Sequence, residues 1–367
     1  MSNVSFYDGS PYAPLMLDAV ILRPDVPLMH ILLYACFAFA VGLLLTPSFI
    51  RFLIRNRVGK QLRVETVDGQ DPSVFRKYHQ HKFGTPTMGG ILVWASILLT
   101  VLFSRLLSYG GFAESSLLQR GQVYLPLGTM VALGLLGGLD DYLNIIGVGK
   151  KRGLDVLPKI LTLIVIGTMG ALWFYFKLGY DSIYVPYYGT LSVGLWYIPI
   201  FLFVLVGTAN AVNVTDGLDG LAGGLLVIAF GSFSVLAYLE GLTVLSAFCA
   251  VCVGAVAAFL WHNVPPARFI MGDTGSLALG GGLAVIAMMI DQVLVLPLIG
   301  FVFVVEMLSV IIQLLSKKYR GGKKVFRAAP IHHHFEALDW GESKVTMRLW
   351  IVGGFAAMLG VIVGVFG

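Results

Sequence analysis

Long apolar runs separated by short polar segments make up the chain from residue 28 to its end. Each run approaches the roughly 20 residues that an α-helix needs to cross a bilayer. The pattern predicts an all-α polytopic membrane protein with about ten transmembrane helices, in which residues 1–367 form a single integral membrane domain. The ten runs are 28–50, 86–104, 123–139, 156–176, 194–212, 217–239, 242–261, 274–290, 293–315 and 346–366.

The composition supports a membrane protein. Hydrophobic residues make up 57% of the chain and charged residues only 12%, whereas about a quarter of the residues in soluble domains are charged. No soluble domain is left to bind nucleic acid, so no nucleic-acid partner is expected. Cys249 and Cys252 lie inside an apolar run and are interpreted as small buried residues rather than as a metal or redox pair. Residues 1–27 lack the pattern of a signal peptide, so the first span is expected to act as its own insertion signal.

Basic residues predict the orientation. Of the 25 Lys and Arg residues, 21 fall in or beside the loops after the first, third, seventh and ninth runs. The positive-inside rule therefore places these loops in the cytoplasm and both termini in the periplasm. A basic cytoplasmic face suits anionic lipid headgroups or a phosphorylated substrate.

Polar residues crowd the segment 210–220, between the fifth and sixth runs. A charged or amide group without a partner in hydrocarbon costs several kcal/mol, so these side chains must line a wet space. Asn213, Asp216 and Asp219 recur three apart and would share one face if the segment is helical. A helix start capped by Thr215 or Asp216 explains one acid, but not two acids and two asparagines. We interpret the segment as a binding site for a polar ligand.

Two adjacent acids, Asp140 and Asp141, end the third run. Carboxylates at this end of a helix oppose its dipole unless a cation offsets them. Neighbouring side chains diverge by about 100°, which predicts separate roles rather than one shared metal ion. The alternative is a solvated pair at a helix end. Lys159 and the basic residues at 150–152 are interpreted as ordinary topology signals.

Asp273 opens the eighth run, between two glycines. It could be a plain N-cap. Hydroxyl residues within 274–276 and Asn263 upstream favour a site for magnesium, which prefers oxygen ligands and keeps waters that phosphate can replace. In the ninth run, Glu306 is interpreted as a structural acid paired toward the bundle interior, whereas Gln313 stays open between structure and ligand contact.

Three consecutive histidines at 332–334 follow the last basic stretch. Neighbours on one chain cannot easily all bind one ion, so zinc is less favoured than hydrogen bonds from the imidazoles to phosphate oxygens. In the first basic loop, Pro86 after Thr85 predicts a helix start. Its free N–H groups beside Lys82 would attract phosphate, although the motif taken alone slightly favours a plain helix start.

Five motifs, taken in order along the chain, resemble the phospho-N-acetylmuramoyl-pentapeptide transferase family. The acidic motifs alone are similar to the wider superfamily of polyprenyl-phosphate N-acetylhexosamine-1-phosphate transferases, and the triple-histidine segment narrows the resemblance. The motifs are Thr85-Pro-Thr-Met-Gly-Gly90, Leu139-Asp-Asp-Tyr142, Asn213-Val-Thr-Asp-Gly-Leu-Asp-Gly220, Met271-Gly-Asp-Thr-Gly-Ser276 and Pro330-Ile-His-His-His-Phe-Glu336.

The resemblance implies an enzyme of the bacterial inner membrane, often a homodimer, that transfers phospho-MurNAc-pentapeptide from UDP-MurNAc-pentapeptide to undecaprenyl phosphate. UMP and lipid I would be released at the cytoplasmic face, with Mg²⁺ required, in the first membrane step of peptidoglycan synthesis. The catalytic residues that it implies are Asp140, Asp141, Asp273, which is also the metal ligand, and His332. The substrate-binding residues that it implies are Lys82, Asn213, Asp216, Gly217, Leu218 and Asp219 on the nucleoside side, and Asn263, Gln313 and His333 along the diphosphate and sugar.

Three questions stay open from the sequence. The family usually has lysines soon after the paired acids, but here 144–149 intervene, so the basic residue that meets the lipid phosphate is not identified. Asp140 is expected to orient or deprotonate that phosphate, and both a direct displacement and an aspartyl-phosphate route fit. The rival class is a secondary transporter, and a UDP-GlcNAc-specific relative is the rival enzyme. No internal repeat is found, and the polar residues crowd the cytoplasmic edge, which favours an enzyme.

Overall fold

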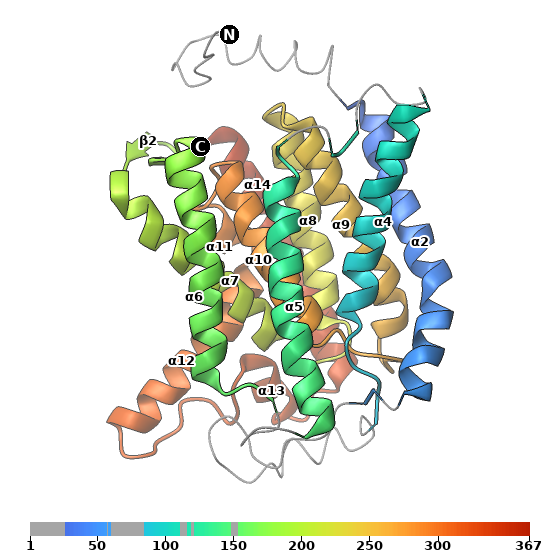
Figure 1. The fold of residues 1–367 in the computed structure, drawn as a ribbon. Coiled ribbons are helices and arrows are strands. Elements are labelled where there is room, and N and C mark those ends of the chain that lie inside the picture. The colour runs from blue at the N-terminus through green and yellow to red at the C-terminus, as the bar shows by residue number, and fades with distance from the viewer. Residues whose placement is uncertain (1–25, 57, 60–83, 111–115, 119–120, 148–152) are drawn as a thin grey trace.

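The computed structural model describes residues 26–56, 58–59, 84–110, 116–118, 121–147 and 153–367. Long helices run side by side in it as one bundle (Figure 1). Each long helix overlaps one of the predicted apolar runs, so the all-α polytopic architecture is confirmed. The long helices are α2 (Leu28–Arg55), α4 (Gly90–Tyr109), α5 (Tyr124–Ile146), α6 (Val156–Leu172), α7 (Tyr197–Thr215), α8 (Leu221–Leu239), α9 (Thr243–Asn263), α10 (Asp273–Met289), α12 (Phe301–Tyr319) and α14 (Glu342–Phe366).

Eight helices of the described residues are long and apolar enough to cross a membrane. The other two long helices differ for identifiable reasons. α10 has only 17 residues and is buried along nearly its whole length. α12 carries three charged residues, Glu306, Lys317 and Lys318. Both helices nonetheless pack among the eight, because α10 contacts α5 and α7, and α12 contacts α7 and α14.

Short elements complete the fold. A five-residue π-helical segment, η2 (Trp173–Lys177), continues α6, and a 3-10 turn, η3 (Gly194–Trp196), precedes α7. The helical turns α11 (Leu296–Ile299) and α13 (Ile331–Glu336) flank α12. A small antiparallel hairpin, β1 (Ser182–Val185) with β2 (Gly189–Ser192), connects η2 to η3.

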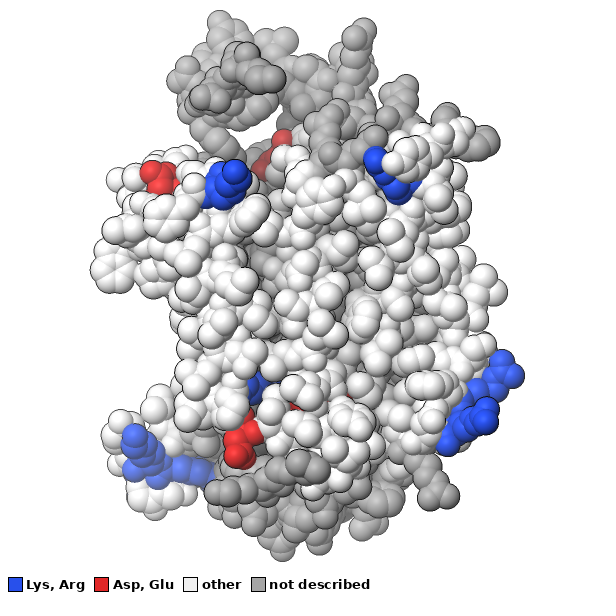
Figure 2. Space-filling model, viewed as in Figure 1, with Lys and Arg blue, Asp and Glu red and all other residues white. Residues whose placement is uncertain are grey.

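The long helices have their C-terminal ends alternately at the two ends of the bundle. α2, α5, α7, α9 and α12 finish at one end, which we call the site end, and α14 finishes at the other end beside the hairpin (Figure 1). This is the alternation that the sequence predicted for its basic loops. On the face shown in Figure 2, charged side chains gather near the two ends and leave a white belt between them.

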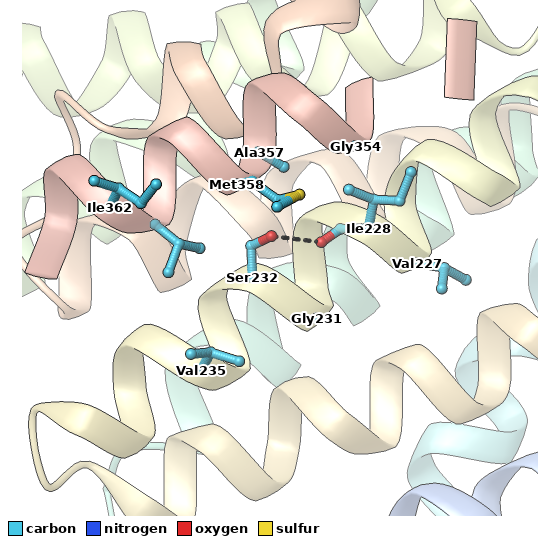
Figure 3. A pocket seen from close by; sticks show the side chains of 10 residues that line it. Val227, Ile228, Gly231, Ser232, Val235, Gly354, Ala357, Met358 and Ile362 are labelled. Carbon is cyan, nitrogen blue, oxygen red and sulfur yellow. Dashed lines mark hydrogen bonds between the residues drawn. The ribbon is translucent and has the colours of Figure 1, made fainter. Parts of the chain in front are cut away.

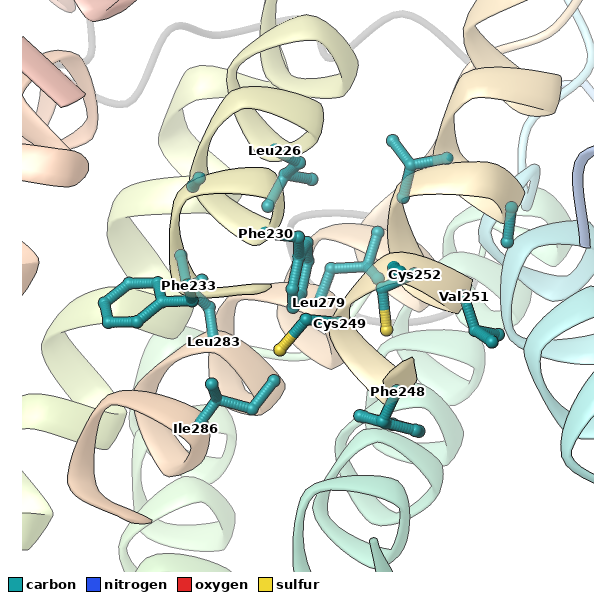
Figure 4. Packing of buried hydrophobic residues seen from close by; sticks show 14 of the residues in the cluster. Leu226, Phe230, Phe233, Phe248, Cys249, Val251, Cys252, Leu279, Leu283 and Ile286 are labelled. Carbon is teal, nitrogen blue, oxygen red and sulfur yellow. The ribbon is translucent and has the colours of Figure 1, made fainter. Parts of the chain in front are cut away.

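The bundle core is apolar. Aromatic side chains of α8 and α9, including Phe230, Phe233 and Phe248, pack against Leu279 of α10 (Figure 4). Cys249 and Cys252 are free thiols buried in the same cluster, so their interpretation as small buried residues is confirmed.

A shallow apolar groove of about 470 Å³ runs between α8 and α14 (Figure 3). Its one polar side chain, Ser232, donates its hydroxyl hydrogen to the carbonyl of Ile228. The groove therefore offers only hydrocarbon surface, as expected for a face turned toward lipid. It is lined by Val227, Ile228, Gly231, Ser232, Val235, Gly354, Ala357, Met358, Val361 and Ile362.

Asp291 makes the stability of the fold depend on pH. It lies in the turn after α10, where its Oδ1 accepts the backbone N–H of Tyr184 at 3.0 Å, and burial raises its pKa to about 6. The folded protein therefore holds this proton more tightly than the unfolded chain, and the stability that the proton confers is lost as the pH rises from about 4 toward 6. We expect Asp291→Asn, which is always neutral and tolerates the positive φ of this position, to flatten the fall in melting temperature over that range. Parallel melting curves of the two proteins, measured in detergent at each pH, would contradict this assignment.

Candidate active site

The acidic motifs meet where α10 begins between the ends of α5 and α7. The approach of α5 to α10 depends on Gly137, because a Cβ at this position would lie 2.1 Å from the carbonyl oxygen of Asp273. Any larger residue would push the two helices apart. Close packing here brings Asp140 and Asp141 to the first residues of α10.

Lys159 joins two of the acids. Its Nζ donates to Oδ2 of Asp140 at 3.1 Å and also to Oδ2 of Asp273. The three side chains are only 14%, 5% and 18% exposed. Oδ1 of Asp140 accepts the backbone N–H of Leu154 at 2.5 Å. Two carboxylates crowded together repel each other unless a cation lies between them, and here Lys159 supplies that charge.

The interpretation of Lys159 as an ordinary topology signal was therefore wrong. Its position in the sequence carried a usable signal, because it lies inside the predicted run 156–176, and a charge within a span is a functional candidate by default. The basic residues at 150–152 lie outside the described residues.

Asp141 has a different role from Asp140, as the sequence predicted. Its Oδ2 accepts the backbone N–H of Thr274 at 3.0 Å and the hydroxyl of the same residue at 2.7 Å. Its Oδ1 accepts the N–H of Asp273 at 3.2 Å. Asp141 thus caps the N-terminus of α10 from a neighbouring helix, where a negative charge is favoured by the helix dipole. The N-cap of α10 is Gly272, and Asp273 is the first residue of the helix. The alternative that Asp273 is a plain N-cap therefore does not hold.

The segment 210–220 is not one helix. α7 ends at Thr215, and a turn leads to α8, whose N-cap is Gly220. Thr215 and Asp216 therefore end a helix and cap no helix start. Asp216 accepts the N–H of Gly272 at 3.1 Å.

Asn213 and Asp219 accordingly point to different places. Nδ2 of Asn213 donates to Oδ1 of Asp273 and to Oγ of Ser276, both at 2.8 Å. Oδ2 of Asp219 accepts the N–H of Ala267 at 2.9 Å, in the loop before α10. The three polar residues do not share one face, because the helix ends between the first and the third.

His332 and Glu306 form a buried pair beside the turn between α7 and α8. Nδ1 of His332 lies 2.9 Å from Oε2 of Glu306, and the two side chains are 1% and 0% exposed. The interpretation of Glu306 as a paired interior acid is confirmed. The other ring nitrogen, Nε2, faces Gly217, where an added Cβ would lie only 2.4 Å away. The turn can therefore meet the imidazole only because this residue has no side chain.

The three neighbouring histidines have three different partners. His333 pairs through Nδ1 with Oε2 of Glu336 at 2.7 Å, and Nδ1 of His334 accepts the N–H of Arg327 at 3.1 Å. His332 has Glu306. Their side chains thus diverge, as expected for consecutive residues of a helix.

Comparison with known proteins identifies the family. Residues 123–291 match the family model described as Glycosyl transferase family 4. A phospho-N-acetylmuramoyl-pentapeptide-transferase from Chloroflexus aurantiacus is 41% identical over 344 residues, which cover 90% of this chain and 88% of that relative. Proteins of the same name from Geobacillus sp. and Bacillus mycoides are also 41% identical, over 336 and 342 residues that cover 90% and 92% of this chain and 96% and 98% of those relatives.

The chain belongs to the phospho-N-acetylmuramoyl-pentapeptide-transferase family. The resemblance seen in the motifs is therefore confirmed. In this member of the transferase family, two of the acidic motifs supply Asp140 and Asp273, which Lys159 of α6 joins. The triple-histidine motif supplies His332, which pairs with Glu306 of α12.

Two amides that the resemblance assigned to the diphosphate and sugar region have scaffold contacts in this transferase. Oδ1 of Asn263 accepts the N–H of Gly220 at 2.9 Å, and its Nδ2 donates to the carbonyl of Phe269 at 3.0 Å. Gln313 accepts the N–H groups of both Val325 and Phe326 at 3.0 Å and donates to the carbonyl of Phe326. Both amides tie loops together at the site end, and their contact with the substrate stays a prediction.

The motif Thr85–Gly90 does not start a helix at Pro86. It lies against the segment that leads into α10. The N–H of Gly89 and the carbonyl of Ile270 bond at 2.9 Å, as do the N–H of Ile270 and the carbonyl of Pro86. α4 begins only at Gly90. The prediction of a helix start at Pro86 is therefore wrong by four residues, and Lys82 lies outside the described residues.

The remaining predicted substrate residues differ in exposure. Leu218 is buried at 3% exposure within the apolar core, whereas Gly217 and Asp216 are half-buried at the site end. The half-buried part of the turn offers backbone and carboxylate groups to a ligand. Their contact with the nucleoside stays a prediction.

The oxygen atoms of the site fit magnesium. This ion takes oxygen ligands and usually uses one or two carboxylates, completing its coordination with water and substrate phosphates. Asp140 and Asp273 supply carboxylates side by side, already held by the positive charge of Lys159. Within the described part of the chain, no group of three or more His, Cys, Asp or Glu side chains could hold a metal ion.

Proposed function

We infer that this protein transfers phospho-MurNAc-pentapeptide from UDP-MurNAc-pentapeptide to undecaprenyl phosphate, giving lipid I and UMP. Family membership supports the reaction, since its relatives carry the name phospho-N-acetylmuramoyl-pentapeptide-transferase. The single structural observation that carries it is the cluster of Asp140, Lys159 and Asp273 at one end of the bundle. A phosphate attacking a diphosphate brings two anions together, so the site must supply positioned charge.

Each member of the cluster has a role in this proposal. Lys159 is proposed as the basic residue, left unidentified by the sequence, that would meet a non-bridging oxygen of the lipid phosphate. Asp140 would orient the lipid phosphate or take its remaining proton. Asp273 would hold Mg²⁺, which supplies neutralisation of the phosphate charge when it is bound. Asp141 would keep the first turn of α10, and so Asp273, in place.

The charges of the sequence support a proposed orientation. The loops that carry most of the Lys and Arg residues would be cytoplasmic by the positive-inside rule, with both termini in the periplasm. The family and the apolar spans support the bacterial inner membrane as the location. We also propose that the protein is a homodimer, as the resemblance to the family implies.

A detergent assay tests the reaction. The purified protein is mixed with UDP-MurNAc-pentapeptide, undecaprenyl phosphate and MgCl₂, and we expect UMP release that stops on chelation with EDTA and returns with added MgCl₂. Release without a sealed vesicle excludes transport as the primary activity. UDP-GlcNAc offered in the same assay is expected to give little UMP, and preferential use of UDP-GlcNAc would assign the chain to the related GlcNAc-1-phosphate chemistry.

Asp140→Asn tests the role of Asp140 as a base. A phosphate monoester has its second pKa near 6, so the lipid phosphate is mostly dianionic above pH 8 and requires no strong base. We expect the variant to retain most of its turnover above pH 8 and to lose it progressively at lower pH. Complete loss at every pH would point to a covalent or metal-binding role for Asp140.

A further inference from the structure

The pair formed by Glu306 and His332 lies outside the cluster of acids and has two unusual features. Both side chains are fully buried, at 0% exposure, although both can carry charge. One nitrogen and one oxygen of the pair, Nε2 of His332 and Oε1 of Glu306, have no hydrogen-bond partner among the described residues. Leaving a buried polar atom unpaired costs about 1–3 kcal/mol, so such atoms are rare unless a function retains them.

The pair joins α12 to α13 and faces the turn between α7 and α8. Glu306 is the sixth residue of α12, and its carbonyl oxygen accepts the hydroxyl of Ser309 at 2.7 Å. His332 lies in the first turn of α13. The backbone N–H of His332 also points to Oε2 of Glu306, at 3.5 Å. The ring is thus held from one side only, and its free nitrogen is directed at Gly217 in the turn between α7 and α8.

The bond to Glu306 decides which nitrogen carries a proton. An ionised carboxylate can only accept hydrogen bonds, so the proton in the Nδ1–Oε2 bond belongs to Nδ1. Nε2 is then the atom available to a ligand. To donate to an anion as well, the ring must carry a second proton on Nε2, taken up from solvent with the anion; the imidazolium then donates from Nδ1 to Glu306 and from Nε2 to the anion.

The turn that Nε2 faces reaches the surface of the site end. Gly217 and Asp216 are half-buried, and Asp216 is bonded to Gly272, the residue before Asp273. A phosphate oxygen at this turn would therefore lie close to both His332 and the start of α10. Because residue 217 has no side chain, the imidazole packs directly against the backbone of this turn, which alone lies between Nε2 and the surface of the site end.

We propose that Glu306 is a positioning residue for the reaction: it holds His332 so that Nε2 donates a hydrogen bond to a phosphate oxygen of the UDP-linked substrate beside Gly217. This inference rests on the proposed transferase function. Carboxylates behind ligand-binding imidazoles are typically worth about 10- to 100-fold in affinity or activity.

Glu306→Gln is the variant that tests the role, because it keeps the size of the side chain and removes its charge. We expect kcat for UMP release to fall about 10- to 100-fold, with little change in KM. The melting temperature is expected to change little, because the amide oxygen of glutamine can still accept the hydrogen bond from Nδ1. Glu306→Asp, which keeps the charge, is expected to recover part of kcat.

A double variant separates positioning from independent action. If Glu306 acts only through the imidazole, Glu306→Gln combined with His332→Gln will have the same kcat as His332→Gln alone. The matched control is Glu240→Gln, which removes a carboxylate that accepts from Gln292 at 2.8 Å at the opposite end of the bundle. It is expected to leave kcat unchanged.

A second measurement needs no turnover. Solid-state ¹⁵N NMR of the histidine-labelled protein, assigned with His332→Gln, should show a protonated Nδ1 that shifts in Glu306→Gln and is unaffected in Glu240→Gln. If the wild type releases no UMP, the proposed reaction is wrong. The ¹⁵N signal of Nδ1 still reports whether Glu306 holds His332, because it does not depend on turnover. The proposal is overturned by an unprotonated Nδ1, by an unchanged kcat in Glu306→Gln, or by a loss of activity that only follows a loss of folded protein.

Discussion

Replacing Lys159 with Met is expected to lower UMP release by about 100-fold or more, the usual cost of removing one positioned donor from a charged transition state. The change also leaves Asp140 and Asp273 facing each other without the cation between them. Breaking a buried ion pair by removing one partner costs about 3–5 kcal/mol, and the partial exposure of these side chains places the expected loss at the lower end of that range. Activity and melting temperature should both fall.

Lys159→Arg is the control for charge. A guanidinium keeps the positive charge but spreads it over a planar fork, so its contacts to two carboxylates differ from those of an ammonium group. We expect stability to recover and activity to return only in part. Full activity in Lys159→Met would show that the cation between the acids has no part in the reaction.

Asp141→Ala is expected to be the most destabilising single change in the site. It removes the acceptor of three hydrogen bonds at the start of α10 and exposes none of the donors to water, because Asp141 and Thr274 are 6% and 1% exposed. Unpaired buried donors and the loss of a charged cap together cost about 3 kcal/mol. Since Asp273 is the first residue of α10, activity should fall with the melting temperature.

Thr274→Val separates the two effects. It deletes only the hydroxyl bond of 2.7 Å and keeps both backbone bonds to Asp141. We expect a loss of about 1 kcal/mol in the free energy of unfolding, with most activity retained. If Asp141→Ala keeps the melting temperature of the wild type and loses activity alone, the role of Asp141 is chemical rather than structural.

The sequence located the acids well because an acid at a membrane edge has few explanations. Asp140, Asp273 and Glu306 each stood in or beside an apolar run, where a charge must have a partner. The predicted divergence of Asp140 and Asp141 also followed from helix geometry alone. Lys159 was harder to recognise, since a lysine near a cytoplasmic helix start is also the commonest topology signal.

The sequence could not assign the buried amides of the site end to structure or to ligand contact. Asn263 and Gln313 use both amide atoms to hold backbone groups of neighbouring loops. The same atoms would serve equally well in contact with a sugar or a phosphate. Residue type therefore cannot distinguish the two uses, and only the positions of the loops do.

The sequence alone determined the helices, their number and their alternation, because these follow from local hydrophobicity and from the need to satisfy backbone hydrogen bonds in lipid. It also marked most of the polar residues that gather at the site end. Only the tertiary structure decided which of them meet: Lys159 with Asp140 and Asp273, Asp141 with the start of α10, and His332 with Glu306 and Gly217. Such pairings join residues far apart in the chain, and they depend on how closely the helices pack, which no local pattern records.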